Sequence, residues 1–434
     1  MIAAGCDHGG YRLDKEMEKN FLAILAEELV PAMGCTEPIA LAYAAATAKS
    51  VLGCKPDRIV AKCSGNIVKN VRCVTIPNTE GMTGIEAAVA VGALGGDAGR
   101  KMEVMEGVTK ENLAAAKELL DRGACSVEYL NSEIPLHFIV EVFSGENSAG
   151  VEIRYAHTNI TSILKNGKSV YAADSDAATQ NTGANRALLS IENIKAFADE
   201  VELSKIAPFC ERQVRYNMDI AYEGMTGRYC VGIGPMLRAA YAESTITRMK
   251  AYTAAASEAR MGGCDMPVMI TSGSGNQGIA SSVPIIVYAH ENNIPREKMY
   301  RALSFSSLMT IFQKEFIGKL SAFCGAVSAS CAAGAAITYL VGGTIDQIKA
   351  TIDNALADIP GIICDGAKVS CAAKIATSLD AAMMAHNLAM AGKAYEAYTG
   401  ILKEDAGETI RCVGYIGKYG MQQTDKEIIK MMLK

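Results

Sequence analysis

The sequence predicts an α+β protein, in which a small α+β domain precedes a large all-helical domain or is inserted in it. Three observations lead to this prediction. The 434 residues are enough for two or three domains, each with its own core. Strand-like and helical patterns mix between residues 57 and 164. From residue 191 to the end, Ala-rich helical periods continue with only short Gly or Pro breaks.

Residues 19–52 predict two helices separated by a sharp break. Apolar residues recur at helical spacing in the first helix, and the second is rich in alanine. Pro38 suits the first position of the second helix, with Thr36 or Glu37 as its N-cap. Cys35 is therefore expected just before a helix N-terminus, where the helix dipole favours a thiolate.

The next part of the chain predicts a compact α+β module. Alternating apolar residues indicate strands, and two helical stretches interrupt them, the second closed by Gly123 as its C-terminal cap. An Asn-Gly turn at residues 166–167 and a polar stretch at 172–185 mark the exit from this module. The predicted strands are 58–63, 67–76, 125–130, 136–143 and 151–157, and the predicted helices are 84–94 and 109–122.

The long uncharged stretch 322–342 is interpreted as a helix buried in protein. It is full of Gly, Ser and Ala, and such a span would insert into a membrane poorly beside a Leu/Ile-rich one. A capping box of Thr344 and Gln347 predicts that the following helix covers residues 345–357.

Charge and composition argue against two classes of partner. With 42 basic and 47 acidic residues the net charge is −5, and no block of like charge supplies the basic surface of a nucleic-acid binder. The first ten residues lack the basic start and the apolar run of a secretory signal. We therefore expect a cytoplasmic protein with no nucleic-acid and no membrane partner.

The 14 cysteines cannot be assumed to form disulfides, because cytosolic thiols are kept reduced, so each needs its own explanation. Most stand singly in apolar surroundings, where a cysteine behaves as a small buried hydrophobe. Cys364 and Cys371 are seven residues apart, as are Cys324 and Cys331, and a spacing of seven returns to the same helical face. Nearby glycines would let the backbone donate hydrogen bonds to an iron–sulfur cluster. The spacing alone leaves an iron–sulfur cluster, a structural zinc ion and a set of buried thiols open.

A run of Gly and Ser at residues 271–278 predicts a backbone nest for a small carboxylate. No Gly-Lys-Ser/Thr follows it, so it is not a P-loop, and the dinucleotide fingerprint is absent. An ordinary loop is the alternative. The five histidines show neither ligand spacing nor a catalytic arrangement, so each is interpreted as a surface or strand residue. The candidate substrate-binding residues are Ser272, Gly273, Ser274, Gly275 and Asn276.

Four motifs, at residues 31–38, 272–278, 320–325 and 363–371, resemble those of the L-cysteine desulfidase family. That family is also called UPF0597 and is related to the α-chain of iron–sulfur L-serine dehydratases. The resemblance implies an oxygen-sensitive 4Fe-4S enzyme that converts L-cysteine to pyruvate, ammonia and hydrogen sulfide without pyridoxal phosphate. It also implies roles for four residues: Cys324, Cys364 and Cys371 as cluster ligands, and Cys35 as proton acceptor.

We divide the chain into four parts: an N-terminal extension at residues 1–18, a helical segment at 19–52 packing on the catalytic domain, an α+β domain at 53–175, and a helical iron–sulfur catalytic domain at 176–434. The first 17 residues resemble the opening of a type B ribose-5-phosphate isomerase. The rest of that domain is absent, so the extension is not expected to have that function.

Two other functions fit the same sequence features. An L-serine dehydratase would use the same cluster on a hydroxyl group. A non-catalytic amino-acid-binding protein would keep the residues as a structural zinc site. L-Cysteine is the expected small-molecule partner, and the oligomeric state is left open, a homodimer included.

Overall fold

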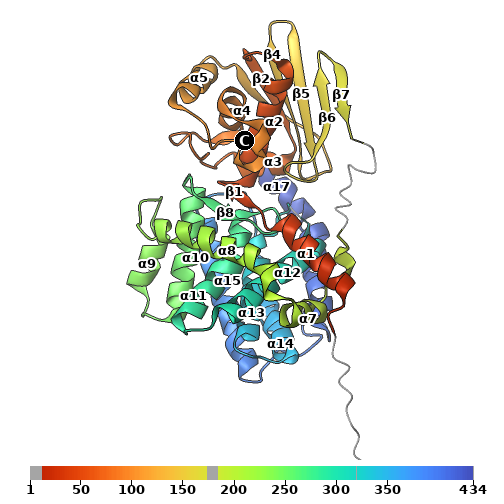
Figure 1. The fold of residues 1–434 in the computed structure, drawn as a ribbon, viewed down its shortest axis with the longest axis vertical. Coiled ribbons are helices and arrows are strands. Elements are labelled where there is room, and N and C mark those ends of the chain that lie inside the picture. Colours follow the sequence, from red (N-terminus) through yellow and green to blue (C-terminus); the bar gives the residue numbers. More distant parts are fainter. Residues whose placement is uncertain (1–11, 174–183, 319, 434) are drawn as a thin grey trace, which may run out of the picture.

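The computed structural model describes residues 12–173, 184–318 and 320–433 and consists of a β-sheet module at one end of a large helical body (Figure 1). The predicted α+β class with a large helical part is confirmed. Most of the predicted N-terminal extension, including its isomerase-like motif, lies outside the described residues. The last part of that range, from Lys15, belongs to helix α1 (Lys15–Glu28), which Asp14 caps.

The sheet has six strands in the order β3-β2-β4-β5-β6-β7. Strands β2 and β3 are parallel, and all the other neighbours are antiparallel. The strands are β2 (Arg58–Cys63), β3 (Cys125–Tyr129), β4 (His137–Ser144), β5 (Asn147–Arg154), β6 (Ile160–Lys165) and β7 (Lys168–Ala172).

Two of the sequence interpretations in this module are wrong. The predicted strand 67–76 is instead helix α3 (Gly65–Val71), because its short apolar run covers a buried helical face, and periodicity cannot separate the two over so few residues. The Asn-Gly turn does not mark the exit of the module but joins β6 to β7. Asn166 and Gly167 both have positive φ, 49° and 74°, as a tight hairpin turn requires.

Helix α2 (Thr36–Leu52) covers the sheet together with α4 (Gly84–Gly95), and α5 (Lys110–Asp121) packs on α4. Within residues 19–52, α1 contacts α7, α8 and α12 of the helical body, whereas α2 packs on the sheet module. Helix α2 is buried around most of its circumference, since its alanines allow close packing on both β4 and α4. A Cβ atom added at Gly92 of α4 would lie 2.4 Å from the Ala42 Cα atom, so the two helices touch backbone to backbone.

The helical body packs around α11, α12, α13 and α15. A short antiparallel ladder of β1 (Pro31–Met33) and β8 (Pro267–Met269) lies where the body meets the sheet module. The helices are α7 (Ile191–Glu200), α8 (Leu203–Gly224), α9 (Ile233–Ala240), α10 (Thr245–Met261), α11 (Gly275–Glu291), α12 (Arg296–Ile317), α13 (Gly325–Leu340), α14 (Ile345–Asp358), α15 (Cys371–Met390), α16 (Ala406–Tyr415) and α17 (Gln422–Leu433).

Helix α13 is the predicted buried helix, and all of its residues except Gly325 and Tyr339 are buried. Its glycine at position 334 lets it lie against α15, where an added Cβ would come within 2.9 Å of the Ala382 carbonyl oxygen. The predicted capping box of Thr344 and Gln347 at the start of α14 is also confirmed. Among the described residues, no helix is both long and apolar enough to cross a membrane.

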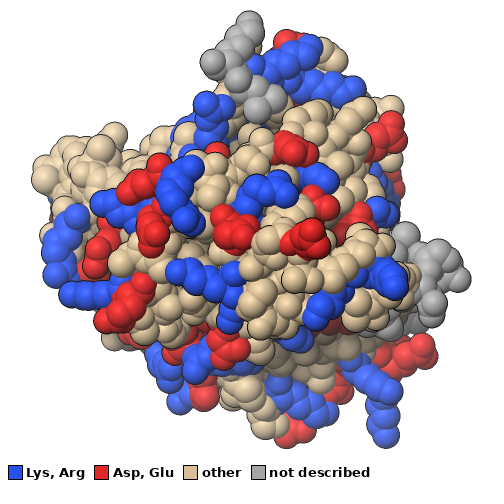
Figure 2. All heavy atoms as spheres, turned by 90° about the horizontal axis from the view of Figure 1, so that it is seen from above, with Lys and Arg blue, Asp and Glu red and all other residues tan. Residues whose placement is uncertain are grey.

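The face shown in Figure 2 carries basic and acidic side chains interspersed with one another. Such a surface has no extended field of one sign. This face therefore lacks the basic patch by which proteins attract nucleic acid.

Candidate active site

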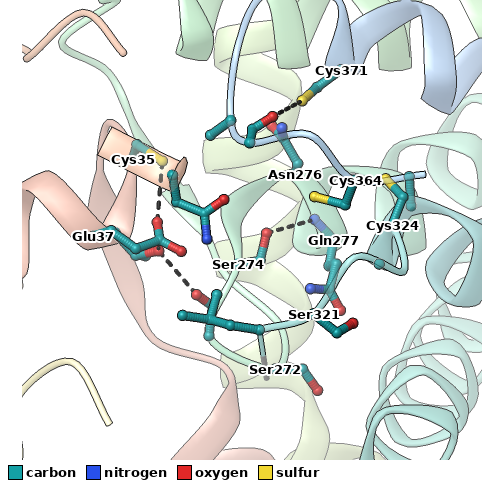
Figure 3. Close-up of a pocket in the computed structure, with 18 of the residues that line it drawn as sticks. Cys35, Glu37, Ser272, Ser274, Asn276, Gln277, Ser321, Cys324, Cys364 and Cys371 are labelled. Carbon is teal, nitrogen blue, oxygen red and sulfur yellow. Dashed lines mark hydrogen bonds between the residues drawn. The ribbon is translucent and has the colours of Figure 1, made fainter. Parts of the chain in front are cut away.

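A small cavity lies where the helical body meets the sheet module, and the predicted site residues meet in it (Figure 3). Its volume is about 100 Å³, below the ~300–1,000 Å³ of pockets for drug-sized ligands, so it suits a very small molecule. Each of the four sequence motifs contributes to its lining. The sequence-predicted residues that line it are Cys35, Ser272, Gly273, Ser274, Asn276, Cys324, Cys364 and Cys371.

Four helices begin at this cavity. Cys35 is the N-cap of α2, Ser274 of α11 and Cys324 of α13, while Cys371 is the first residue of α15. The first N–H groups of a helix have no partner within the helix, and the helix dipole is positive at that end. The cavity is therefore electrostatically suited to anions such as thiolates and carboxylates.

Two loops bring the predicted metal ligands together. The Cys324 N–H donates to the Ile362 carbonyl (2.9 Å), and the Cys364 N–H donates to the Ala322 carbonyl (2.7 Å). This short antiparallel bridge places the two cysteines next to each other, and Figure 3 shows Cys371 on the same side of the cavity. The sequence could not show that the pair would meet through a β-bridge between distant loops.

The three sulfur atoms have donors around them. A hydrogen bond from the Cys324 thiol, helped by the charge of Lys69, lowers the pKa of Cys364. The same hydrogen bond and burial raise the pKa of Cys324. Burial raises the pKa of Cys371. Backbone N–H groups favour the thiolate of each sulfur, from Ala326, Gly366 and Lys368 respectively.

Cys331 does not belong to this group, although it has the same spacing of seven from Cys324. It lies in the main hydrophobic core, 2% exposed, and does not line the cavity. Burial raises its pKa to about 12. Cys331 is therefore one more buried thiol.

The three cysteines can be compared with the ligand sets of a single ion and of a cluster. Among the residues that the structure describes, no three His, Cys, Asp or Glu side chains are close enough to hold one metal ion. Structural zinc draws four ligands to about 2.0–2.3 Å from one point. In a four-iron cluster each thiolate binds a different iron, so three sulfurs around one cavity, with backbone donors, fit such a group.

Lys69 of α3 holds the two cysteine-bearing loops in place. Its ammonium group is fully buried and donates to the carbonyls of Ser321 (3.2 Å) and Cys364 (3.4 Å) and to the Asp425 carboxylate of α17 (2.5 Å). Gly366, with φ of +100°, packs so closely that an added Cβ would lie 2.3 Å from the Lys69 carbonyl oxygen. The sheet module thus helps to shape the ligand loops.

The structure corrects the expected ionisation of Cys35. It is the N-cap of α2 as predicted, but the helix starts at Thr36, so Pro38 is its third residue and neither Thr36 nor Glu37 is the cap. Burial and the adjacent Glu37 carboxylate raise the pKa of Cys35 well above its ordinary value and outweigh the helix dipole. Cys35 is therefore a thiol at rest, and its Sγ donates to Glu37 Oε2 (3.3 Å).

Glu37 is ionised although it is buried. Burial pushes its pKa upward, but the His157 imidazole beside it lowers the pKa, to about 2. The His157 Nε2 and Glu37 Oε1 atoms are 4.0 Å apart. Cys35, Glu37 and His157 therefore form a buried chain of proton-carrying groups at one wall of the cavity.

Most side chains of the predicted nest at residues 272–276 already have partners within the protein. Ser272 and Gly273 both have positive φ, 49° and 73°, and turn the chain into α11. Ser274 caps that helix by accepting from the Gln277 N–H. The Asn276 Oδ1 accepts from Ser257 and from Arg260, each at 3.1 Å. Gly275 does not itself line the cavity; it lies under the Arg260 side chain.

Comparison with known proteins identifies the family. The family model described as Serine dehydratase alpha chain matches residues 99–430. The chain belongs to the serine dehydratase alpha chain family. The UPF0597 protein of Lachnoclostridium phytofermentans is 46% identical over 96% of this chain and 100% of its own length. The UPF0597 protein of Finegoldia magna is 44% identical over 96% of this chain and 100% of its own length. That of Treponema denticola is 41% identical over 97% of this chain and 99% of its own length. The resemblance to UPF0597 and to the serine dehydratase α-chain is confirmed.

In this member of the serine dehydratase alpha chain family, sequence reasoning missed several residues that line the cavity. The interpretation of His157 as a surface or strand residue is wrong, because its side chain is only 11% exposed and faces Glu37. Burial lowers the pKa of Lys314, in the last turn of α12, to about 8. Glu37 and Gln277 could have been found from the sequence, because they lie in the motifs at residues 31–38 and 272–278. Among the missed residues are Glu37, His157, Arg260, Gln277 and Lys314.

Proposed function

We propose that this protein is an iron–sulfur lyase that degrades L-cysteine to pyruvate, ammonia and hydrogen sulfide by β-elimination. The supporting observation is that three cysteines, Cys35 and the start of α11 line one small cavity. Cys324, Cys364 and Cys371 would hold a 4Fe-4S cluster. When bound, this cluster supplies an iron not ligated by the protein, a Lewis acid for the leaving group.

The start of α11 orients the substrate. The free N–H groups of its first turn and the Ser272 and Gly273 turn suit a carboxylate. A carboxylate held there leaves Cα in the cavity between this turn and Cys35, because both line it. Fixing the Cα–H bond toward the base is the step in which orientation contributes most to rate.

Cys35 has to lose its own proton before it can accept the proton on Cα. The Glu37 carboxylate already accepts a hydrogen bond from Cys35 and is the group that can take this proton. At rest, the raised pKa of Cys35 and the lowered pKa of Glu37 oppose this proton transfer. We therefore infer that the transfer accompanies substrate binding, which brings an ammonium charge into the site. As Cys35 takes the Cα proton, the C–H electron pair forms the Cα–Cβ double bond and the Cβ–S bond breaks. Sulfur leaves with the bonding pair, and the aminoacrylate product hydrolyses to pyruvate and ammonia.

L-Serine is the second candidate substrate, and the family name favours it. The same site would then expel a hydroxyl group in place of a thiol. A soft sulfur leaving group suits iron in a thiolate environment better than a hydroxyl does. We therefore place L-cysteine first.

The substrate is tested by comparing two products on anaerobically reconstituted protein. We expect sulfide release from L-cysteine to exceed pyruvate release from L-serine in kcat/KM. A faster reaction with L-serine would make the protein a serine dehydratase. Absence of both products in protein with a full cluster would contradict the lyase proposal.

A further inference from the structure

Three buried polar atoms at the cavity have no hydrogen-bond partner within the described part of the chain. They are His157 Nε2, Arg260 Nε and Gln277 Oε1. Burying a donor or acceptor without a partner is unfavourable, so such atoms at a cavity point to a ligand that satisfies them. Two of the three, on Arg260 and Gln277, have complementary chemistry: a cationic donor and a neutral acceptor.

Arg260 is a buried cation without a counter-ion. Its side chain is at the end of α10 and is 2% exposed, and no Asp or Glu of the described residues forms an ion pair with it. Of its five N–H donors, one on Nη1 is engaged by the Asn276 Oδ1 atom (3.1 Å). The guanidinium lies directly on the first residue of α11, where a Cβ at Gly275 would be 2.3 Å from Nε. A carboxylate at the start of α11 would therefore meet both the free helix N–H groups and the guanidinium.

Gln277 lies beside the metal-ligand side of the cavity. It is 6% exposed, and its amide packs over Gly325, where an added Cβ would be 2.6 Å from the Gln277 Nε2 atom. Gly325 directly follows Cys324. The unpartnered Oε1 is thus an acceptor within the same first turn of α11 as the carboxylate position, on the side of the thiols.

We propose that Arg260 and Gln277 together recognise the two charged groups of a free α-amino acid, Arg260 the carboxylate and the Gln277 Oε1 atom the ammonium. This inference rests on the proposed function and specifies its substrate class: amino acids with both groups free, and not amides, esters or N-blocked derivatives. Its physical basis is that each charged group of the ligand would satisfy a buried polar atom that has no partner among the described residues.

The test uses L-alanine, which carries both groups but no leaving group. Binding of L-alanine, L-alaninamide and propionate to the anaerobic holoprotein is measured by calorimetry. We expect Arg260→Met to weaken the binding of L-alanine and of propionate by about 30-fold or more. The affinity for L-alaninamide should stay unchanged, because the amide has no carboxylate. We expect Gln277→Leu to weaken the binding of L-alanine and of L-alaninamide by roughly 10-fold or more. The affinity for propionate, which has no ammonium group, should stay unchanged.

The matched control is Arg248→Met, on the same helix. Arg248 is paired with Glu243 and Glu291 and is not part of the cavity lining, so all three affinities should stay unchanged. Equal weakening of all three ligands by Arg260→Met, no weakening at all, or no binding of L-alanine to the wild type would overturn the inference. The predicted binding pattern in a protein that releases neither sulfide nor pyruvate would contradict the proposed lyase function alone, because L-alanine cannot undergo the elimination.

Discussion

Replacing Cys324, Cys364 or Cys371 singly with serine is expected to abolish the visible absorption of the anaerobically reconstituted protein and most of its bound iron. Each of these residues supplies one of only three protein bonds to the proposed cluster. Loss of one ligand should also remove all turnover. The measurement is the absorption spectrum and the iron content of each variant, taken beside the wild type.

Cys331→Ser is the matched control for these three variants. Cys331 shares the spacing of Cys324 but lies in the main core, so its variant should keep the full cluster. Its loss of packing should appear only as a lower unfolding temperature. A full cluster in Cys371→Ser together with a lost cluster in Cys331→Ser would show that the ligands are assigned to the wrong members of the pairs.

Cys35→Ser is expected to lower kcat by roughly 10²- to 10⁴-fold while the cluster and its iron content stay intact. This is the range for removal of a general base, and a serine hydroxyl is a far poorer proton acceptor than a thiolate. Glu37→Gln should also lower kcat, because the Cys35 thiol then loses the carboxylate that accepts its hydrogen bond. The measurements are kcat and absorption on the same anaerobic samples.

Two results would contradict this role for Cys35. Loss of the cluster in Cys35→Ser would make Cys35 a fourth ligand. Unchanged turnover in Cys35→Ser with a strong loss in Glu37→Gln would make the Glu37 carboxylate itself the base. Cys35 also packs near Cys371, so the iron content has to be measured in every variant.

Much of the fold could be predicted from local patterns. Local patterns predict the strands β2 and β4 and the helices α4 and α5. The capping box predicts the start of α14. Helix α3 could not be predicted, because its short apolar run fits a strand as well. The packing of α2 on the sheet depends on tertiary contacts, which local periodicity does not contain.

The site was predictable where a residue stood in a distinctive motif. Cys35, Cys324, Cys364 and Cys371 were all named from their motifs, and all line the cavity. The sequence does not identify Arg260 and His157 as site residues. An arginine in an Ala-rich helix and a histidine after a strand look like ordinary surface residues. Their roles come from burial next to α11 and α2, which the chain reaches only when it folds. The ionisation of Cys35 was mispredicted for the same reason: the dipole is local, whereas desolvation is set by the whole fold.

The central claim is that Cys324, Cys364 and Cys371 hold an iron–sulfur cluster, and metal analysis of anaerobically purified protein tests it most directly. Iron, zinc and acid-labile sulfide are measured per chain on the wild type. The proposed site predicts about four irons with a similar amount of acid-labile sulfide. Stoichiometric zinc without acid-labile sulfide would contradict it and would favour a non-catalytic amino-acid-binding protein with a structural metal.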